Sequence, residues 1–193
     1  LKAGIYSTPM VHAWGSTPDR LLPGSTGYPL DPEHFHGYFG GCGKTGFEEN
    51  DARQWAEWKF DYLKYDWPAC DEEHTRRISQ ALRRTGRDFV LSITTECRLH
   101  WIDTYLHCAN MYRSNADTVD QWERIAANAF QADAWAKHVS PGHWFDMDML
   151  ALGRMMMGRT SSDFQERQLR ENRLTRNEMI SHMSMWALFP SPI

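Results

Sequence analysis

Hydrophobic and polar positions along the chain follow two different periods. Short apolar and aromatic stretches predict strands, and longer stretches with apolar residues three or four apart predict amphipathic helices. The predicted strands are residues 1–7, 61–67, 89–96, 110–117, 143–153 and 189–193. The predicted helices are residues 51–60, 72–86, 101–108, 119–137 and 161–187. Residues 8–48, between the first strand and the first helix, are irregular and rich in Gly and Pro.

This order of elements predicts the class of fold. Strands that alternate with helices of this length favour a parallel sheet with right-handed crossovers. Asn50 and Asp71 are the predicted N-caps of the first two helices, and Gly86 is the predicted end of the second. Six strands are too many for a ferredoxin-like unit, and no Gly-rich phosphate loop follows the first strand. The predicted fold is therefore α/β, a partial (β/α)8 barrel that lacks its first strands.

The same pattern predicts the domain organisation. Residues 1–193 would form one catalytic barrel domain, from about strand 3 to strand 8, with no second domain. Both ends of the sequence fall in strand-like apolar runs, so we expect the chain to be part of a longer protein. For the full-length protein we expect a secreted, periplasmic or lysosomal-type compartment, and a homodimer is left open.

Composition limits the classes of partner that the protein is expected to bind. A hydrophobic content of 41% in 193 residues allows one sizeable core. The net charge of −4 gives no reason to expect nucleic acid or an anionic membrane surface as a partner. No apolar run approaches the roughly 18 residues of a membrane-spanning helix. The nine Trp residues fit either a large core or a site where sugar rings stack on aromatic faces.

The predicted strand 61–67 ends on a carboxylate. Because side chains two apart in a strand point the same way, Lys64 and Asp66 would share one face. A lysine in that position can keep an aspartate ionised and orient it, as a nucleophilic carboxylate requires. The alternative is a surface salt bridge at the end of a strand.

Other polar residues occupy equivalent positions. Tyr6, Asp66, Glu96, Asp117 and Asp148 each lie at or just past the C-terminal end of a different predicted strand. In (β/α)8 barrels that face carries the active site. Carboxylates from separate strands would meet there, which favours a catalytic site over solvated loop residues.

Several segments together resemble glycoside hydrolase family 27, the α-galactosidases and α-N-acetylgalactosaminidases. The resemblance covers nearly the whole chain in the same order. It is carried by GIYS, PGSTGY, DYLKYDW, YRSNADTVDQW, PGHWFDMDMLALG and SHMSMWALFPSPI. The resemblance implies that Asp66 is the nucleophile and Asp117 the general acid/base. It also implies that Tyr6 and Lys64 contact the sugar, and that Arg113 binds the side of its 2-hydroxyl.

The resemblance assigns four further positions. Glu96 and Leu99 match the family's specificity loop, where the N-acetylgalactosaminidases carry small residues. Asp148 and Met149 match substrate-binding positions at the seventh strand, although Met147 replaces the usual proline and puts the local turn in question.

These roles predict a retaining exo-glycosidase that releases terminal α-D-galactosyl residues from an oligosaccharide or glycoconjugate. Retaining enzymes place two carboxyl groups roughly 5–5.5 Å apart across the anomeric carbon. Because a nearby arginine opposes protonation of an acid, we expect Arg113 to point at the sugar rather than at Asp117. The alternatives are a β-L-arabinopyranosidase, an α-N-acetylgalactosaminidase, or a sugar-binding barrel without catalysis.

No cofactor and no metal are predicted. His34-x-His36 and Asp146-x-Asp148 have spacings compatible with metal ligands, but neither has a third partner at motif spacing. The family ties neighbouring loops together with disulfides, which suggests Cys42–Cys70 and Cys97–Cys108, with free thiols as the alternative. Residues 34–45 look like an insertion in a loop that borders the site.

Overall fold

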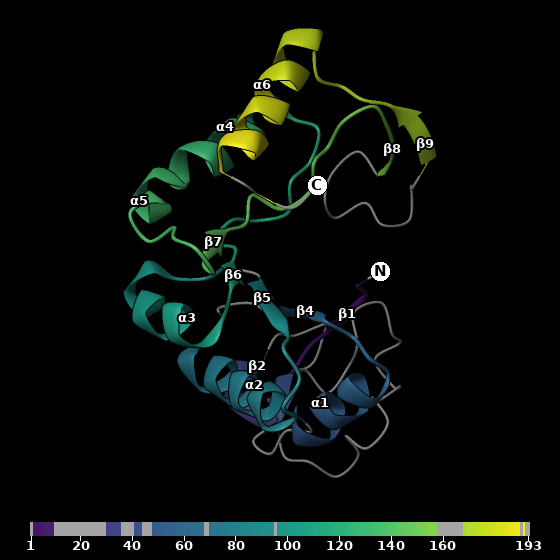
Figure 1. The fold of residues 1–193 in the computed structure, drawn as a ribbon. Coiled ribbons are helices and arrows are strands. Elements are labelled where there is room, and N and C mark those ends of the chain that lie inside the picture. The colour runs from purple at the N-terminus through teal and green to yellow at the C-terminus, as the bar shows by residue number, and fades with distance from the viewer. Residues whose placement is uncertain are drawn as a thin grey trace. The chain divides into compact units, whose positions relative to one another are not determined.

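The computed structural model describes residues 2–9, 30–35, 41–43, 48–67, 70–94, 96–157, 168–189 and 191 (Figure 1). The chain forms two compact units, Leu1–Tyr112 and Arg113–Ile193. Each unit carries part of the predicted site, so each is described by itself.

The first unit is built on parallel strands. Its strands are β1 (Gly4–Ser7), β4 (Tyr62–Asp66), β5 (Val90–Thr94) and β6 (Met111–Tyr112), in that spatial order. Tyr6 is in register with Lys64, and Asp66 is in register with Thr94. Because the strands are parallel, their carboxyl ends lie along one edge of the sheet. The predicted α/β class with a parallel sheet is confirmed.

Burial along β4 explains how this strand presents its polar residues. Leu63 and Tyr65 are buried, whereas Lys64 and Asp66 are partly exposed, so the two polar side chains share a face as predicted. The neighbouring strand comes unusually close: a Cβ on Gly4 would lie 2.9 Å from Tyr62 Cδ1. A larger residue than glycine at position 4 would push β1 away from β4.

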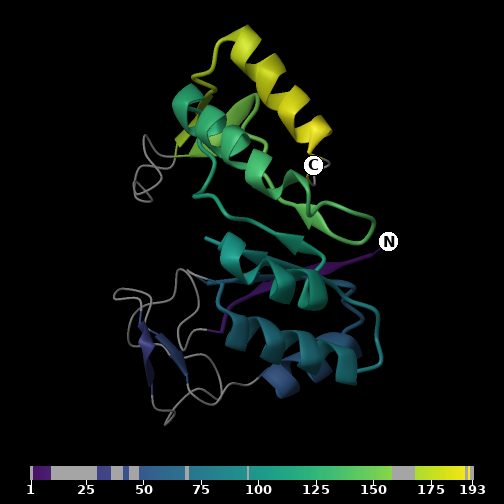
Figure 2. The same ribbon diagram turned by 90° about the vertical axis from the view of Figure 1, so that its left-hand side faces the viewer.

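Three helices accompany these strands. They are α1 (Glu48–Glu57), α2 (Glu72–Arg84) and α3 (Ile102–Cys108), the last preceded by the 3₁₀ turn η2 (Leu99–Trp101). Helix α2 packs between α1 and α3, and Figures 1 and 2 show all three on the same side of the strands. Within the region predicted to be irregular, β2 (Leu30–Phe35) and β3 (Gly41–Gly43) form an antiparallel pair.

The predicted caps of α2 are confirmed, and that of α1 is wrong. Asp71 is the N-cap of α2, with its carboxylate accepting from the His74 backbone N–H, and Gly86 follows the C-cap with φ 73°. Helix α1 begins at Glu48, so Asn50 lies inside its first turn. The buried carboxylate of Glu48 accepts from Arg77 of α2 at 3.1 Å, which joins this end of α1 to α2.

The second unit holds the remaining elements. They are α4 (Trp122–Gln131), α5 (Asp133–Ala136), β7 (Trp144–Phe145), β8 (Arg154–Met157), β9 (Gln168–Glu171) and α6 (Arg176–Leu188). Strands β8 and β9 pair in antiparallel fashion. None of the helices within the described ranges is long and apolar enough to cross a membrane.

Element boundaries in this unit differ from those predicted. The helix predicted for 161–187 is wrong at residues 168–171, which form β9, and Thr175 caps α6 through a capping box with Glu178. The strands predicted for 110–117 and 143–153 shrink to Met111–Tyr112 and Trp144–Phe145. In the segments that follow, backbone groups bond to side chains: the Ala116 carbonyl oxygen accepts from Asn128, and the Met147 N–H donates to Ser191. The strand predicted for 189–193 lies mostly outside the described residues.

Asp71 provides a test of the first unit. Its carboxylate also accepts from Trp67 Nε1 at 2.8 Å and from His74 Nδ1 at 2.9 Å. Burial raises the pKa of Asp71, but the bonds from His74 and Trp67 outweigh it and hold the pKa well below its usual range. Its stabilisation is therefore present above pH 3.8 and is lost as the pH falls below that value.

We predict that Asp71→Ala lowers the free energy of unfolding of the full-length protein by about 3 kcal/mol at neutral pH, measured by urea titration. The loss combines the helix cap with two buried donors left without an acceptor. Glu73→Ala, at an exposed position in the same helical turn, should change stability by less than about 0.5 kcal/mol. Equal effects of the two variants would contradict the prediction.

Candidate active site

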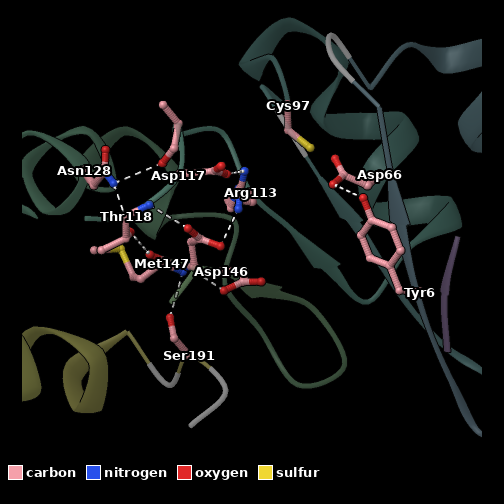
Figure 3. Close-up of polar contacts among 12 residues, drawn as sticks. Tyr6, Asp66, Cys97, Arg113, Asp117, Thr118, Asn128, Asp146, Met147 and Ser191 are labelled. Atoms are coloured by element: carbon pink, nitrogen blue, oxygen red, sulfur yellow. Dashed lines mark hydrogen bonds and ion pairs between the residues drawn. The ribbon is translucent and has the colours of Figure 1, made fainter. Parts of the chain in front are cut away.

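The first unit brings together Tyr6 and Asp66. Asp66 is the last residue of β4, and its Oδ2 accepts a hydrogen bond from Tyr6 Oη at 2.7 Å (Figure 3). Lys64 lies two residues earlier on the same face of the strand. The parallel pairing of β1 with β4 accounts for this arrangement, since it places Tyr6 beside the end of the neighbouring strand. A contact between Lys64 and Asp66 stays a prediction.

Glu96 and Leu99 lie in the loop after β5. Glu96 is exposed and has φ 59°, in the left-handed region that non-glycine residues rarely adopt. Leu99 is also exposed and begins η2. Cys97, between them, is buried, and its thiol donates to Ile93 O at 3.8 Å. A strained residue in an exposed loop fits a functional position, and the sugar-binding role of both residues stays a prediction.

In the second unit, the buried guanidinium of Arg113 joins two carboxylates. Its Nη2 donates to Asp117 Oδ1 at 2.8 Å, and its Nη1 donates to Asp148 Oδ1 (Figure 3). Asp148 is buried, whereas the side chain of Asp117 is 51% exposed. The expectation that Arg113 points away from Asp117 is therefore wrong. Asp148 fixes one edge of the planar guanidinium, which turns the other edge toward Asp117.

The carboxylate of Asp148 accepts hydrogen bonds from other residues of the protein. Its Oδ2 accepts from the Thr118 backbone N–H at 2.7 Å, and the Asp148 N–H donates to Asp146 Oδ1 at 2.8 Å. The residue has φ 70°, which is left-handed, as at Glu96. Asp148 therefore anchors Arg113 and Thr118, and its predicted contact with substrate stays a prediction. Met149 beside it is 43% exposed and stays a candidate sugar contact.

Met147 occupies the position of the usual proline. Its N–H donates to Ser191 Oγ at 2.9 Å, and its carbonyl oxygen accepts from Thr118 Oγ1 at 3.2 Å (Figure 3). A proline has no N–H and could not make the first bond. Asn128 of α4 completes the network by donating to Thr118 Oγ1 at 3.3 Å. The turn is therefore held by hydrogen bonds where a proline would hold it by its ring.

Helix α6 holds this loop at two further points. Trp186 Nε1 donates to the Asp148 carbonyl oxygen, and His182 Nε2 accepts from the Ala151 N–H, both at 2.9 Å. Both rings are fully buried and meet edge to face. Sequence reasoning missed His182 and Trp186, together with Thr118, Asn128 and Ser191. The spacing of four between His182 and Trp186, which puts both on one helix face, is the signal that could have found the pair.

The metal and cysteine expectations have different outcomes. Within the described ranges, no three His, Cys, Asp or Glu side chains cluster as metal ligands would, and the side chains of His34 and His36 lie outside those ranges.

The Cys97–Cys108 disulfide is wrong, because both residues are free thiols. Helix α3 carries Cys108 about 9 Å from the beginning of that helix. The Cys42–Cys70 pairing has no support, because the Cys70 thiol donates to Trp67 O at 3.4 Å and the Cys42 side chain is outside the described residues. Residues 23–28 and most of the proposed insertion 34–45 are outside them as well.

Comparisons with known proteins identify the family. The family model described as alpha galactosidase A (Melibiase_2) matches residues 32–193. Alpha-galactosidase 2 of Arabidopsis thaliana is 32% identical over 202 residues, which cover 100% of this chain and 40% of that protein. The chain therefore belongs to the α-galactosidase family of glycoside hydrolases, glycoside hydrolase family 27. It spans about two fifths of the length of the curated relatives it matches.

Solved structures identify the fold. A β-L-arabinopyranosidase of this family from Geobacillus stearothermophilus has a TM-score of 0.78 at 25% identity, with 100% of this chain and 48% of that chain covered. A variant of that enzyme with a single substitution is known in complex with arabinose. The α-galactosidase of Saccharomyces cerevisiae with raffinose has a TM-score of 0.63 at 21% identity, with 100% of this chain and 40% of that chain covered. The chain is accordingly a partial barrel of the family fold.

His182 yields a pH-dependent prediction. Burial lowers the pKa of His182 from 6.5 to about 4, so the folded protein holds a neutral ring that accepts from Ala151 N–H. The unfolded chain takes up a proton near pH 6.5, which favours unfolding at lower pH. We predict that between pH 6.5 and 4 the free energy of unfolding falls by up to about 1.4 kcal/mol per pH unit on account of this residue.

Chemical denaturation of the full-length protein across that pH range, with His182→Gln for comparison, measures this contribution. The variant keeps an acceptor but cannot titrate, so its stability should fall less steeply than that of the natural protein. His107→Gln, at an exposed position, should keep the original slope. The prediction fails if His182→Gln and the natural protein lose stability in parallel.

Proposed function

We propose that this chain is the catalytic part of a retaining exo-glycosidase that hydrolyses terminal α-D-galactosyl residues. The curated relatives in the family are α-galactosidases, which supports the substrate. The observation that carries the proposal is the placement of Asp66 at the carboxyl end of β4 with Tyr6 Oη bonded to it. In barrels of this kind, that end of the strands carries the chemistry.

The reaction proceeds in two displacements. Asp66 attacks the anomeric carbon while Asp117 protonates the departing glycosidic oxygen, so a carbon–oxygen bond to Asp66 replaces the glycosidic bond. Asp117 then removes a proton from water, whose oxygen attacks the same carbon and releases Asp66. Two inversions give galactose with its original anomeric configuration.

The surroundings of each carboxylate support its role. The hydrogen bond from Tyr6 orients the Asp66 carboxylate and stabilises its charge. Asp117 faces Arg113, whose positive charge is shared with the buried carboxylate of Asp148. Asp117 therefore meets a largely neutralised pair rather than a lone cation, which suits a group that must both take up and release a proton.

Specificity rests on the remaining candidates. Lys64, Arg113, Asp148 and Met149 would contact sugar hydroxyls and the apolar sugar face, and Glu96 would hydrogen-bond a free 2-hydroxyl. The side chain of Leu99, exposed in the same loop as Glu96, would crowd out an N-acetyl group. A site built around such a polar contact discriminates strongly against analogues that cannot make it.

A second candidate activity is β-L-arabinopyranosidase. The observation in its favour is the TM-score of 0.78 to that enzyme, against 0.63 for the yeast α-galactosidase. Galactose and arabinopyranose differ at C6, so the same two carboxylates would serve either sugar.

A substrate panel decides between these activities. We predict that the full-length protein hydrolyses nitrophenyl α-D-galactoside with a higher kcat/KM than nitrophenyl β-L-arabinopyranoside. The N-acetyl-α-galactosaminide should be hydrolysed at least about 100-fold more slowly than the galactoside, because Glu96 and Leu99 leave no room for the acetamide. If the galactoside is the poorest of the three substrates, the proposed function is wrong.

The role of Asp66 has its own test. We predict that Asp66→Ala lowers kcat on nitrophenyl α-D-galactoside by at least about 10⁴-fold. Azide should restore turnover by attacking the anomeric carbon from the vacated side, which gives the β-galactosyl azide. Asp117→Ala should instead give the α-galactosyl azide, because azide there intercepts the glycosyl-enzyme. NMR of the products distinguishes the two, and an α-azide from Asp66→Ala would exclude it as nucleophile.

A further inference from the structure

We propose that the hydroxyl of Tyr105 is a positioning group that couples the nucleophile to the specificity of the site. Tyr105 lies in α3, away from the strand ends, and is fully buried. Its Oη links the loop after β4, which follows Asp66, to the loop after β5, which carries Glu96 and Leu99. The inference rests on the proposed function, because it assigns roles to those three residues.

The link consists of two hydrogen bonds to one oxygen atom. Tyr105 Oη donates to the Cys70 carbonyl oxygen and accepts from the Arg98 backbone N–H, each at 3.0 Å. A tyrosine hydroxyl has one proton to donate, and here it goes to the first loop while a lone pair serves the second. Burial raises the pKa of Tyr105 well above its usual range, so the hydroxyl keeps that proton at any working pH.

On the side of the nucleophile, the link holds a strained backbone. Cys70 has φ 24°, an unfavourable value for a residue with a side chain. Its carbonyl oxygen receives the Tyr105 bond four residues after Asp66, and Asp71 next to it is pinned to Trp67 and His74. Trp67, directly after Asp66, donates its own N–H to Thr94 O at 2.7 Å. Trp67, Cys70 and Asp71, the described residues between Asp66 and α2, are therefore each held by hydrogen bonds.

In the loop after β5, hydrogen bonds hold the two residues that follow Glu96. The thiol of Cys97 donates back to Ile93 in β5, and Arg98 N–H donates to Tyr105. Arg98 is also the residue from which η2 and Leu99 begin, and no side chain caps that turn. Tyr105 Oη therefore fixes the backbone of the short segment from Glu96 to Leu99 at Arg98.

Removing the hydroxyl takes a donor from the buried Cys70 carbonyl oxygen, which also accepts from Thr75 Oγ1 at 3.4 Å, and takes the acceptor from the Arg98 backbone N–H. A phenylalanine keeps the ring and its stacking on Tyr112, whose ring centroid lies 6.1 Å away. The loss therefore falls on the positions of the two loops more than on the packing of the core. An effect on specificity separates this role from a purely structural one.

The test is Tyr105→Phe in the full-length protein. We expect kcat/KM on nitrophenyl α-D-galactoside to fall about 10-fold, mostly through kcat because the loop of Asp66 shifts. We expect the ratio of kcat/KM between that substrate and the N-acetyl-α-galactosaminide to fall by at least about fivefold, because Leu99 no longer blocks the acetamide. Tyr112→Phe, in the same ring stack but in β6, should leave the ratio unchanged.

Amide hydrogen exchange supplies a second readout that does not depend on any substrate. The Arg98 amide should exchange slowly in the natural protein and at least about 10-fold faster in Tyr105→Phe. The link is overturned if the Arg98 amide exchanges fast in the natural protein. It is also overturned if Tyr105→Phe leaves the ratio of kcat/KM between the two substrates unchanged. If the natural protein hydrolyses none of the substrates, the proposed function fails while the exchange measurement still tests the link.

Discussion

The buried guanidinium of Arg113 is the group on which the second unit's site depends. It lies between a fully buried carboxylate, Asp148, and an exposed one, Asp117. Deleting one partner of such a buried pair typically costs about 3–5 kcal/mol, because the other charge is left uncompensated. The loop around Asp148 is therefore tied through Arg113 to Asp117, the proposed acid/base, by electrostatics as well as by packing. This constraint explains why so many hydrogen bonds from α6, Ser191 and Thr118 converge on that loop.

The first unit holds the loops beside Asp66 and Glu96 by a different set of contacts. Its loops are held by neutral and charge-assisted hydrogen bonds from Tyr105, Trp67 and the Asp71–His74 pair. In the first unit the residues proposed to touch the sugar are exposed or partly exposed, and the groups that position them are buried. Such a division suits an enzyme, since orientation of the reacting groups is maintained by residues that water and substrate do not reach.

Strand ends and charge patterns made much of this arrangement predictable. The alternation in β4 placed Lys64 and Asp66 on one face, and the capping signals at Asp71 and Gly86 were correct. The pairing of Arg113 with Asp117 was not predictable, because it depends on Asp148, which is 35 residues distant in the sequence. Likewise, capping and the 3.6-residue spacing of residues 161–187 predict a helix, and only the pairing with β8 makes residues 168–171 the strand β9.

The supporting groups were the hardest to predict. Tyr105, His182 and Trp186 act through single atoms on the backbone of other elements, and no spacing motif encodes a contact between a ring and a distant carbonyl group. Met147 is a partial exception. Its departure from the proline pattern pointed to a changed turn, and the bond from its N–H to Ser191 is the change.

The left-handed backbone at Asp148 also limits how this site can evolve. At φ 70°, β-branched residues are strongly disfavoured, whereas asparagine and glycine fit readily. Asparagine, which this backbone accepts readily, would keep one of the two acceptor oxygens that Arg113 and the Thr118 N–H use, and it would remove the negative charge that Arg113 needs. Loss of the proposed activity in a descendant of this protein could therefore begin with one substitution of similar shape that the backbone tolerates, which removes the negative charge and one hydrogen bond beside Arg113.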